Sequence, residues 1–213
     1  MDTLEDLPLF PLDVVLYPDE GLPLHIFEPR YKEMIARCLR EDIPFGLILS
    51  RDGGVARVGC TARVERILER YADGRLDLLA RGGDRFRLVR LHDAHAYLSA
   101  DATLVQEPDE PLQTNLRERA IAQHTRLLEL AGRTVRMSLY ATRFVSYAIA
   151  HNAGLTNAQK QEVLELLTEN LRLAYLVQHL ESLIPRVESI DEVRRKVRSN
   201  GHFRDFLPGE GEE

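Results

Sequence analysis

Residues 7–31 read LPLFPLDVVLYPDEGLPLHIFEPRY, and this stretch sets the start of the fold. Two apolar runs, 7–16 and 21–27, are separated by a polar break and predict two strands. Because proline has no backbone N–H to donate, Pro8 and Pro11 make the first strand an edge strand or interrupt it. Pro29 suits the first turn of a helix. The apolar residues that follow at helical spacing predict one buried stripe: Tyr31, Met34, Ile35, Cys38 and Leu39.

Further strand patterns continue from this opening. Residues 45–50 predict a buried strand that ends in a turn at 51–54. Residues 58–65 alternate between apolar and polar side chains, which is typical of a strand with one solvated face. The alternation slips at Ile67 and predicts a bulge, and Asp73-Gly74 predicts a hairpin turn.

Three more strands are expected before the pattern changes. They cover residues 75–80, 85–91 and 97–106, with a turn at Gly82-Gly83 and a loop over 92–95 between them. Six or seven short strands with one intervening helix predict a closed or nearly closed barrel, because closure removes the exposed edges of a sheet.

The second half of the chain has a helical pattern. The change falls near Pro108 and Pro111 and predicts two units, residues 1–110 and 111–205, followed by a frayed acidic tail at 206–213.

Four helices are expected after this boundary. Apolar spacing indicates one helix over 112–131 and a second that contains 139–148 and ends at Gly154. The run Thr156-Asn157-Ala158-Gln159 fits a capping box for a third helix that reaches about Leu167. Thr168 caps a long last helix, in which Pro185 predicts a kink or a break near Leu183.

Composition narrows the class of protein. The 213 residues carry a formal net charge of -6, which disfavours nucleic acid and anionic membranes as partners. We expect no signal peptide and no transmembrane helix, since no apolar run approaches the required length. Cys38 and Cys60 lack a Cys-x-x-Cys spacing and are expected in the core as free thiols, which favours a cytoplasmic location.

The opening stretch 7–31 resembles the start of the amino-terminal domain of Lon proteases, a family that also occurs in cereblon and in small stand-alone bacterial proteins. The run VGCTA at 58–62, with DGR at 73–75 and LLARG at 78–82, is similar to a second signature of that family. In the helical half, AQKQEVLE at 158–165 and NLRL at 170–173 also resemble bacterial Lon. The resemblance implies an α+β fold, namely a PUA-like β-barrel followed by a small α-helical bundle.

Two features differ from a complete Lon protease. A Gly-x-x-x-x-Gly-Lys-Ser/Thr loop, which cradles nucleotide phosphates, does not occur in the sequence, and we expect no peptidase domain in so short a chain. Pro185 also departs from the long helical connector of the family. The expectation is therefore a stand-alone relative of the substrate-recognition domain.

Catalytic and metal-binding interpretations are weak. His92 and His95 have the spacing of two metal ligands but lack a third and fourth, so a polar turn is favoured. His25 lies in an apolar strand and is expected to be packed or hydrogen-bonded rather than a catalytic base. The serines Ser50, Ser99 and Ser138 lack a Gly-x-Ser-x-Gly elbow. We expect no enzyme activity, no metal and no cofactor.

The sequence therefore predicts a non-catalytic module that binds unfolded polypeptide segments or a protein partner. Tyr17, Phe27, Arg30 and Tyr31 are the candidate binding surface, although most of the apolar set around them is expected in the core. An RNA-binding PUA-like protein is the alternative, because the basic cluster 194–198 offers contacts to phosphates. A solvated helix end explains the same cluster, since cations complement the helix dipole there. A small-molecule enzyme is a third hypothesis, which a deep pocket with converging polar groups would favour.

Overall fold

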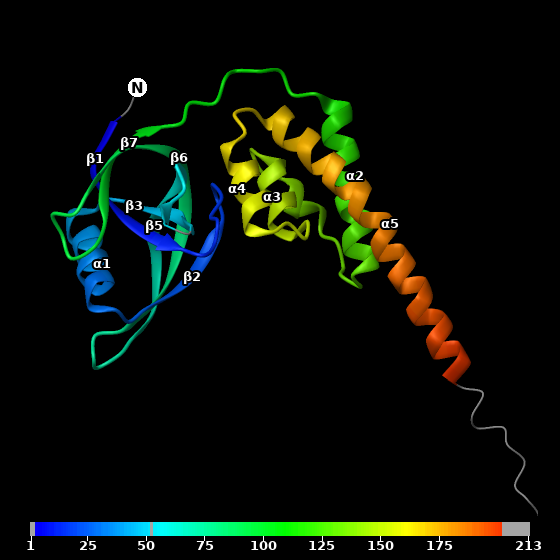
Figure 1. Ribbon diagram of the computed structural model, residues 1–213, viewed down its shortest axis with the longest axis horizontal. Helices are drawn as coiled ribbons and strands as arrows, with labels where there is room; N and C mark the ends of the chain where they lie inside the picture. The colour runs from blue at the N-terminus through cyan, green and yellow to red at the C-terminus, as the bar shows by residue number, and fades with distance from the viewer. Residues whose placement is uncertain (1–2, 52, 202–213) are drawn as a thin grey trace, which may run out of the picture.

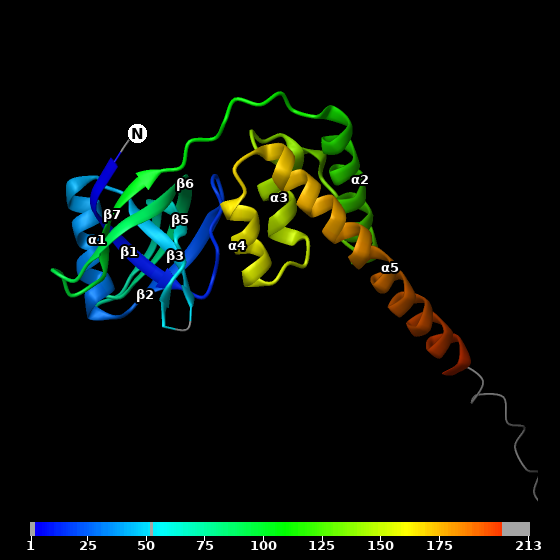
Figure 2. The same cartoon turned by 45° about the horizontal axis from the view of Figure 1, so that its top comes forward.

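The computed structural model describes residues 3–51 and 53–201, with side chains described as far as Ile190 (Figure 1). The strands are β1 (Thr3–Leu12), β2 (Gly21–Ile26), β3 (Phe45–Arg51), β4 (Gly54–Val55), β5 (Val58–Arg70), β6 (Leu76–His92) and β7 (Ser99–Leu104). The helices are α1 (Pro29–Glu41), α2 (Thr114–Leu130), the 3-10 helix η1 (Met137–Tyr140), α3 (Val145–Asn152), α4 (Asn157–Glu165) and α5 (Glu169–Gly201). Figures 1 and 2 show a strand-rich half carrying α1 and a helical half, in which α5 begins beside α2 and its C-terminal part projects away from the rest.

The strands close into a ring, which confirms the predicted α+β fold with a barrel. Pairing runs from β1 through β7, β6, β5 and β3, and β3 then pairs in parallel with β1. The first strand tolerates its two prolines because it changes partner: Thr3 to Pro8 pair with β7, and Leu9 to Leu12 pair with β3. Each half of β1 thus forms backbone hydrogen bonds with one neighbouring strand rather than two, so a missing N–H is tolerated.

One predicted turn is wrong. The sequence pattern indicated a turn at Gly82-Gly83 between strands at 75–80 and 85–91, but β6 runs unbroken from Leu76 to His92. The chain after β1 crosses β6 here: Asp19 N–H donates to the Gly82 carbonyl (3.0 Å), and Gly82 N–H donates to the Glu20 carbonyl (2.8 Å). A Cβ atom on residue 82 would collide with the Tyr17 carbonyl oxygen. Glycine is therefore needed for a close backbone approach and not for a turn.

The bulge and the hairpin are confirmed. The register between β5 and β6 shifts between Ile67 and Glu69. At the hairpin, Tyr71 N–H donates to the Arg75 carbonyl (3.0 Å), and Gly74 has a φ of +81°, which suits glycine. The β5–β6 ribbon therefore bends where the alternation of its side chains slips.

Helix α1 buries most of its predicted stripe. Tyr31, Met34, Ile35 and Cys38 pack into one core cluster with side chains of the sheet, whereas Leu39 stays 42% exposed. The inclusion of Leu39 was wrong, because that residue lies on the rim of the stripe.

A second core cluster contains buried residues from both halves of the molecule. It includes Leu9 and Phe86 of the barrel together with Tyr147 of α3 and Leu176 of α5. The division into units at 1–110 and 111–205 stays a prediction. The tail at 206–213 and the side chains of the basic cluster 194–198 lie outside the described part of the chain.

The predicted second helix of the bundle divides into η1 and α3. The division follows from the contacts of Tyr140 with α2. The Tyr140 hydroxyl is hydrogen-bonded to His124 Nδ1 (2.9 Å), and the Tyr140 carbonyl accepts from Arg117 (3.2 Å). The chain turns there and begins a new helix at Val145. The third helix is confirmed with its capping box, in which the Thr156 hydroxyl and the Gln159 side chain each bond the other's backbone N–H.

Of the predicted kink or break near Leu183, the break is wrong, because α5 continues through Pro185 to Gly201; the kink stays a prediction. Ion pairs to α2 lie on both sides of the proline, from Arg119 to Glu181 and from Arg126 to Glu188 (2.9 Å). Packing against α2 therefore supports the helix across the position where one backbone hydrogen bond is missing. Within the described residues, no helix is long and apolar enough to cross a membrane.

Candidate binding site at the barrel–bundle junction

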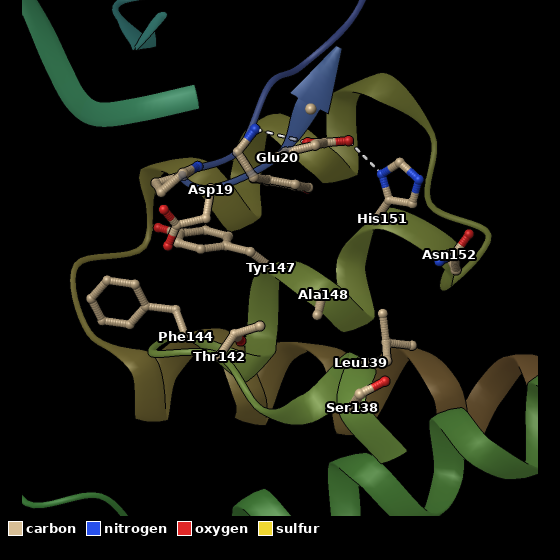
Figure 3. A pocket seen from close by; sticks show the side chains of 13 residues that line it. Asp19, Glu20, Ser138, Leu139, Thr142, Phe144, Tyr147, Ala148, His151 and Asn152 are labelled. Carbon is tan, nitrogen blue, oxygen red and sulfur yellow. Dashed lines mark hydrogen bonds and ion pairs between the residues drawn. The ribbon is translucent and has the colours of Figure 1, made fainter. Parts of the chain in front are cut away.

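A cavity of about 400 Å³ lies where the barrel meets the helical bundle. We call it the junction cavity; Figure 3 shows its lining. One wall is the segment 17–21 between β1 and β2, and the opposite wall comes from η1, α3 and the loop between them. The lining residues are Tyr17, Pro18, Asp19, Glu20, Gly21, Ser138, Leu139, Thr142, Phe144, Tyr147, Ala148, His151 and Asn152.

Tyr17 fixes the barrel wall of the cavity. It is 1% exposed, stacks on Tyr147 with ring centroids 5.0 Å apart, and donates its hydroxyl to the Lys160 carbonyl (3.0 Å). Burial raises the pKa of the Tyr17 hydroxyl, so the group remains a neutral donor. Tyr17 therefore joins the barrel to both α3 and α4.

An ion pair crosses the cavity. One carboxylate oxygen of Glu20 accepts from the Tyr17 N–H (2.9 Å), and the other bonds Nδ1 of His151 on α3. The bond to Glu20 raises the pKa of His151, because the charged imidazole is favoured beside a carboxylate. This pair is a second link between the segment 17–21 and the bundle.

A buried network of two arginines lies behind the cavity. Arg85 of β6 is 4% exposed and donates to the carbonyls of Leu164 (2.9 Å) and Leu166 (2.6 Å), at the end of α4. Arg172 of α5 is fully buried and ion-pairs with Glu107 (2.7 Å), which also contacts Arg85 (3.2 Å). Each guanidinium has partners on more than one element, so the network positions the bundle on the barrel.

The four residues predicted as a binding surface do not form one patch. Tyr17 lines the junction cavity and is otherwise buried. Phe27 is 57% exposed and stacks on His25, with ring centroids 5.7 Å apart. The Arg30 guanidinium lies over the ring of Tyr31, which is itself 8% exposed. Only Phe27 and Arg30 are available on the surface, and a binding role for the four stays a prediction.

Sequence reasoning missed the opposite wall. Phe144 and Tyr147 carry the aromatic lining on that side, whereas the sequence pattern predicts only that they lie in a helix. Their pairing with Tyr17 depends on how the bundle docks, and spacing along the chain does not encode that contact.

Ser138 and His151 both line the junction cavity, but no serine hydroxyl is hydrogen-bonded to a histidine ring among the residues that the structure describes. His92 Nε2 lies 3.0 Å from a carboxylate oxygen of Asp101, and His95 Nε2 lies 3.0 Å from one of Asp6, so each has a separate carboxylate partner. His25 is hydrogen-bonded to Asp77 (2.5 Å), one of the two environments predicted for it. Among residues 3–51 and 53–201, no group of three His, Cys, Asp or Glu side chains is placed to hold a metal ion.

A closed barrel docked on a helical bundle, with an aromatic cavity between them, defines a class of two-part α+β proteins. The family model for the ATP-dependent protease La (LON) substrate-binding domain matches residues 6–182. The chain belongs to the Lon substrate-binding domain family.

Two similar proteins carry the name Lon protease. Lon protease 2 of Syntrophobacter fumaroxidans is 25% identical over 215 residues, covering 92% of this chain and 27% of that protein. Lon protease of Escherichia coli K12 is 27% identical over 210 residues, covering 91% of this chain and 27% of the protease. This chain therefore spans about a quarter of the length of these relatives.

Two solved structures share the fold. The Lon N-terminal domain protein from Xanthomonas campestris has a TM-score of 0.67 and 29% identity, covering 82% of this chain and 98% of that one. The N-terminal domain of Mycobacterium avium complex Lon protease has a TM-score of 0.58 at 18% identity, covering 83% and 98% of the two chains. The barrel and the bundle thus occur together in both structures.

Proposed function

We propose that this chain is a non-catalytic module that binds unfolded polypeptide segments or a protein partner. The observation that carries the proposal is the match of residues 6–182 to a family of substrate-binding domains. The junction cavity supports it, because an aromatic-lined hollow of about 400 Å³ suits large apolar side chains. A cytoplasmic location is part of the proposal, and the free thiols Cys38 and Cys60 agree with a reducing compartment.

Binding of an unfolded model protein tests this function. Fluorescein-labelled lactalbumin, reduced and carboxymethylated so that it cannot fold, should raise its fluorescence anisotropy when the chain is added. Labelled native lactalbumin should bind far less, because its apolar side chains are buried. Equal binding of both forms, or of neither, would contradict the proposed function.

A cavity-filling variant tests where the unfolded protein binds. Ala148 lines the cavity on α3, and Ala148→Gln adds neutral bulk there. We expect affinity to fall about tenfold, which corresponds to ~1.4 kcal/mol. Ala141→Gln is the matched control, because Ala141 is exposed and does not line the cavity.

A labelled single-stranded oligouridine tests the alternative function, RNA binding. Tight RNA binding that weakens steeply with salt would favour the alternative function.

A further inference from the structure

Two more hollows adjoin the junction cavity. One, of about 350 Å³, shares Pro18, Phe144 and Tyr147 with the junction cavity. The next, of about 450 Å³, shares Glu107, Arg143 and Phe144 with the second hollow and extends along the segment 107–112. We call the three together the junction groove. Because successive hollows share walls, one extended segment of polypeptide can occupy all three.

Aromatic rings form the shared wall of the junction groove. Phe144 lines all three hollows and is half-buried, and Tyr147 lines two of them. The Tyr147 hydroxyl is buried and has no hydrogen-bond partner among the described residues. The groove therefore presents apolar ring surface and not this buried hydroxyl, and the fully buried guanidinium of Arg172 lies against both rings, 5.1 Å from the Phe144 centroid and 4.6 Å from that of Tyr147.

The rim of the groove is acidic. Asp19, Asp84, Asp109 and Glu110 are exposed, one or two at each of the three hollows. Among the cationic residues of the groove, Arg85 is buried and bonded to Glu107 and to backbone carbonyls, and His151 is paired with Glu20. Arg81 lies close to Asp19, because its guanidinium donates to the Asp19 carbonyl (2.8 Å). Asp84, Asp109 and Glu110, which lie beside the aromatic rings, attract a cation through both charge and cation–π contact.

The chain itself shows that a guanidinium fits against this wall. Arg143, which is exposed and lies on the rim, has its Cζ 4.8 Å from the centre of the Phe144 ring. A basic side chain of a bound segment would take an equivalent position. Arg143 would then compete with that side chain for the ring, and its charge would repel it.

We propose that the junction groove binds an extended polypeptide segment in which lysine or arginine residues flank aromatic or apolar ones. This inference rests on the proposed function and adds the chemistry of the segment to it. The aromatic wall takes the apolar side chains, and the carboxylates of the rim take the cations on either side.

A pair of peptides tests the charge requirement. Both carry the same phenylalanine and leucine residues and a fluorescein label, and they differ only in lysine against glutamate at the flanking positions. We expect the lysine peptide to bind about tenfold more tightly at low ionic strength, and the difference to shrink in about 0.5 M salt. If the chain binds carboxymethylated lactalbumin but does not distinguish the peptides, the inference fails and the proposed function stands. If it binds none of these probes, both fail.

Charge variants test whether the segment binds in the junction groove. Asp19→Asn combined with Asp109→Asn should remove most of the preference for lysine, and asparagine tolerates the positive φ of residue 19. Glu33→Gln combined with Glu118→Gln is the matched control, because it removes the same charge from exposed sites outside the groove. Arg143→Ala should tighten binding of the lysine peptide severalfold.

Three outcomes would overturn the assignment. One is an equal loss of lysine preference in the groove variant and in its control. Another is no effect of Arg143→Ala on the lysine peptide. The third is a concentration-dependent dimer in sedimentation that the groove variant abolishes, since a second copy of the chain would then be the occupant.

Discussion

Arg85 is a single side chain on which the docking of the two halves depends. It is buried and donates hydrogen bonds to the carbonyls of Leu164, Leu166 and Leu167. These carbonyls lie at the C-terminal end of α4, where the helix supplies no further backbone N–H to bond them. We expect Arg85→Met to lower the free energy of unfolding by about 3 kcal/mol, because the carbonyls of Leu164 and Leu167 lose their Arg85 donor, while Glu107 keeps only its bond to Arg172. Urea denaturation measures this.

Arg87→Met is the control for that prediction. Arg87 lies two residues further along β6 and is exposed, so the same chemical change should cost less than about 0.5 kcal/mol. Similar losses in the two variants would show that the network around Arg85 does not stabilise the fold.

His124 makes the stability depend on pH. It is fully buried in α2, and burial lowers its pKa to about 4 from 6.5. The folded imidazole therefore stays neutral where the unfolded one takes up a proton. Its contribution to stability is present above about pH 6.5 and is lost as the pH falls toward 4. Urea unfolding across that range should show the loss, and His124→Gln should flatten it.

His151 provides the opposite comparison. Its pKa is raised by the bond to Glu20, so its contribution is present below about pH 6.5 and is lost as the pH rises through the folded pKa. His151→Gln should therefore reduce stability mainly at acid pH. The effect should be small, because His151 is half-exposed and its ion pair is partly screened. A parallel pH dependence in the two variants would contradict both assignments.

Helix α5 carries its proline at a cost in stability. Pro185 lacks the N–H that would bond the carbonyl of Glu181, and the flanking ion pairs to α2 compensate for that loss. Replacing Pro185 with alanine should raise the free energy of unfolding by about 1–3 kcal/mol. Thermal denaturation followed by circular dichroism measures the gain. An unchanged or lower midpoint would mean that the proline relieves a bend that packing requires.

Elements with a purely local signal could be predicted from the sequence. The stripe of α1, the capping box at Thr156 and the hairpin at Gly74 each depend on residues close together in the chain. Gly82 could not be interpreted in that way, because a glycine looks the same in a turn and beneath a crossing backbone. The split between η1 and α3 depends on Tyr140 meeting α2, which is a tertiary contact.

The candidate site was less predictable than the elements that build it. Tyr17 was selected from its place in the opening stretch, and it does line the junction cavity. Arg85 and Arg172 gave no signal as buried groups, since arginine is usually exposed and only their distant carboxylate and carbonyl partners allow burial.

At the scale of the whole molecule, the barrel and the bundle should unfold together. One core cluster contains buried residues from both halves, and the arginine network and the Tyr17 contacts bridge the same junction. Urea unfolding followed by tyrosine fluorescence and by circular dichroism should therefore give one coincident transition. Two separated transitions would show that the halves are independent folding units. Arg85→Met should separate the transitions if the network couples the halves.

The crossing at Gly82 has a consequence for the kinetics of recognition. Two backbone hydrogen bonds attach the segment 17–20 to the middle of β6. One side of the junction groove therefore has a fixed shape before a polypeptide segment binds. The entropy of ordering that side is lost when the chain folds and not at the moment of encounter. Capture of a passing segment should therefore follow simple second-order kinetics, with no slow rearrangement after first contact.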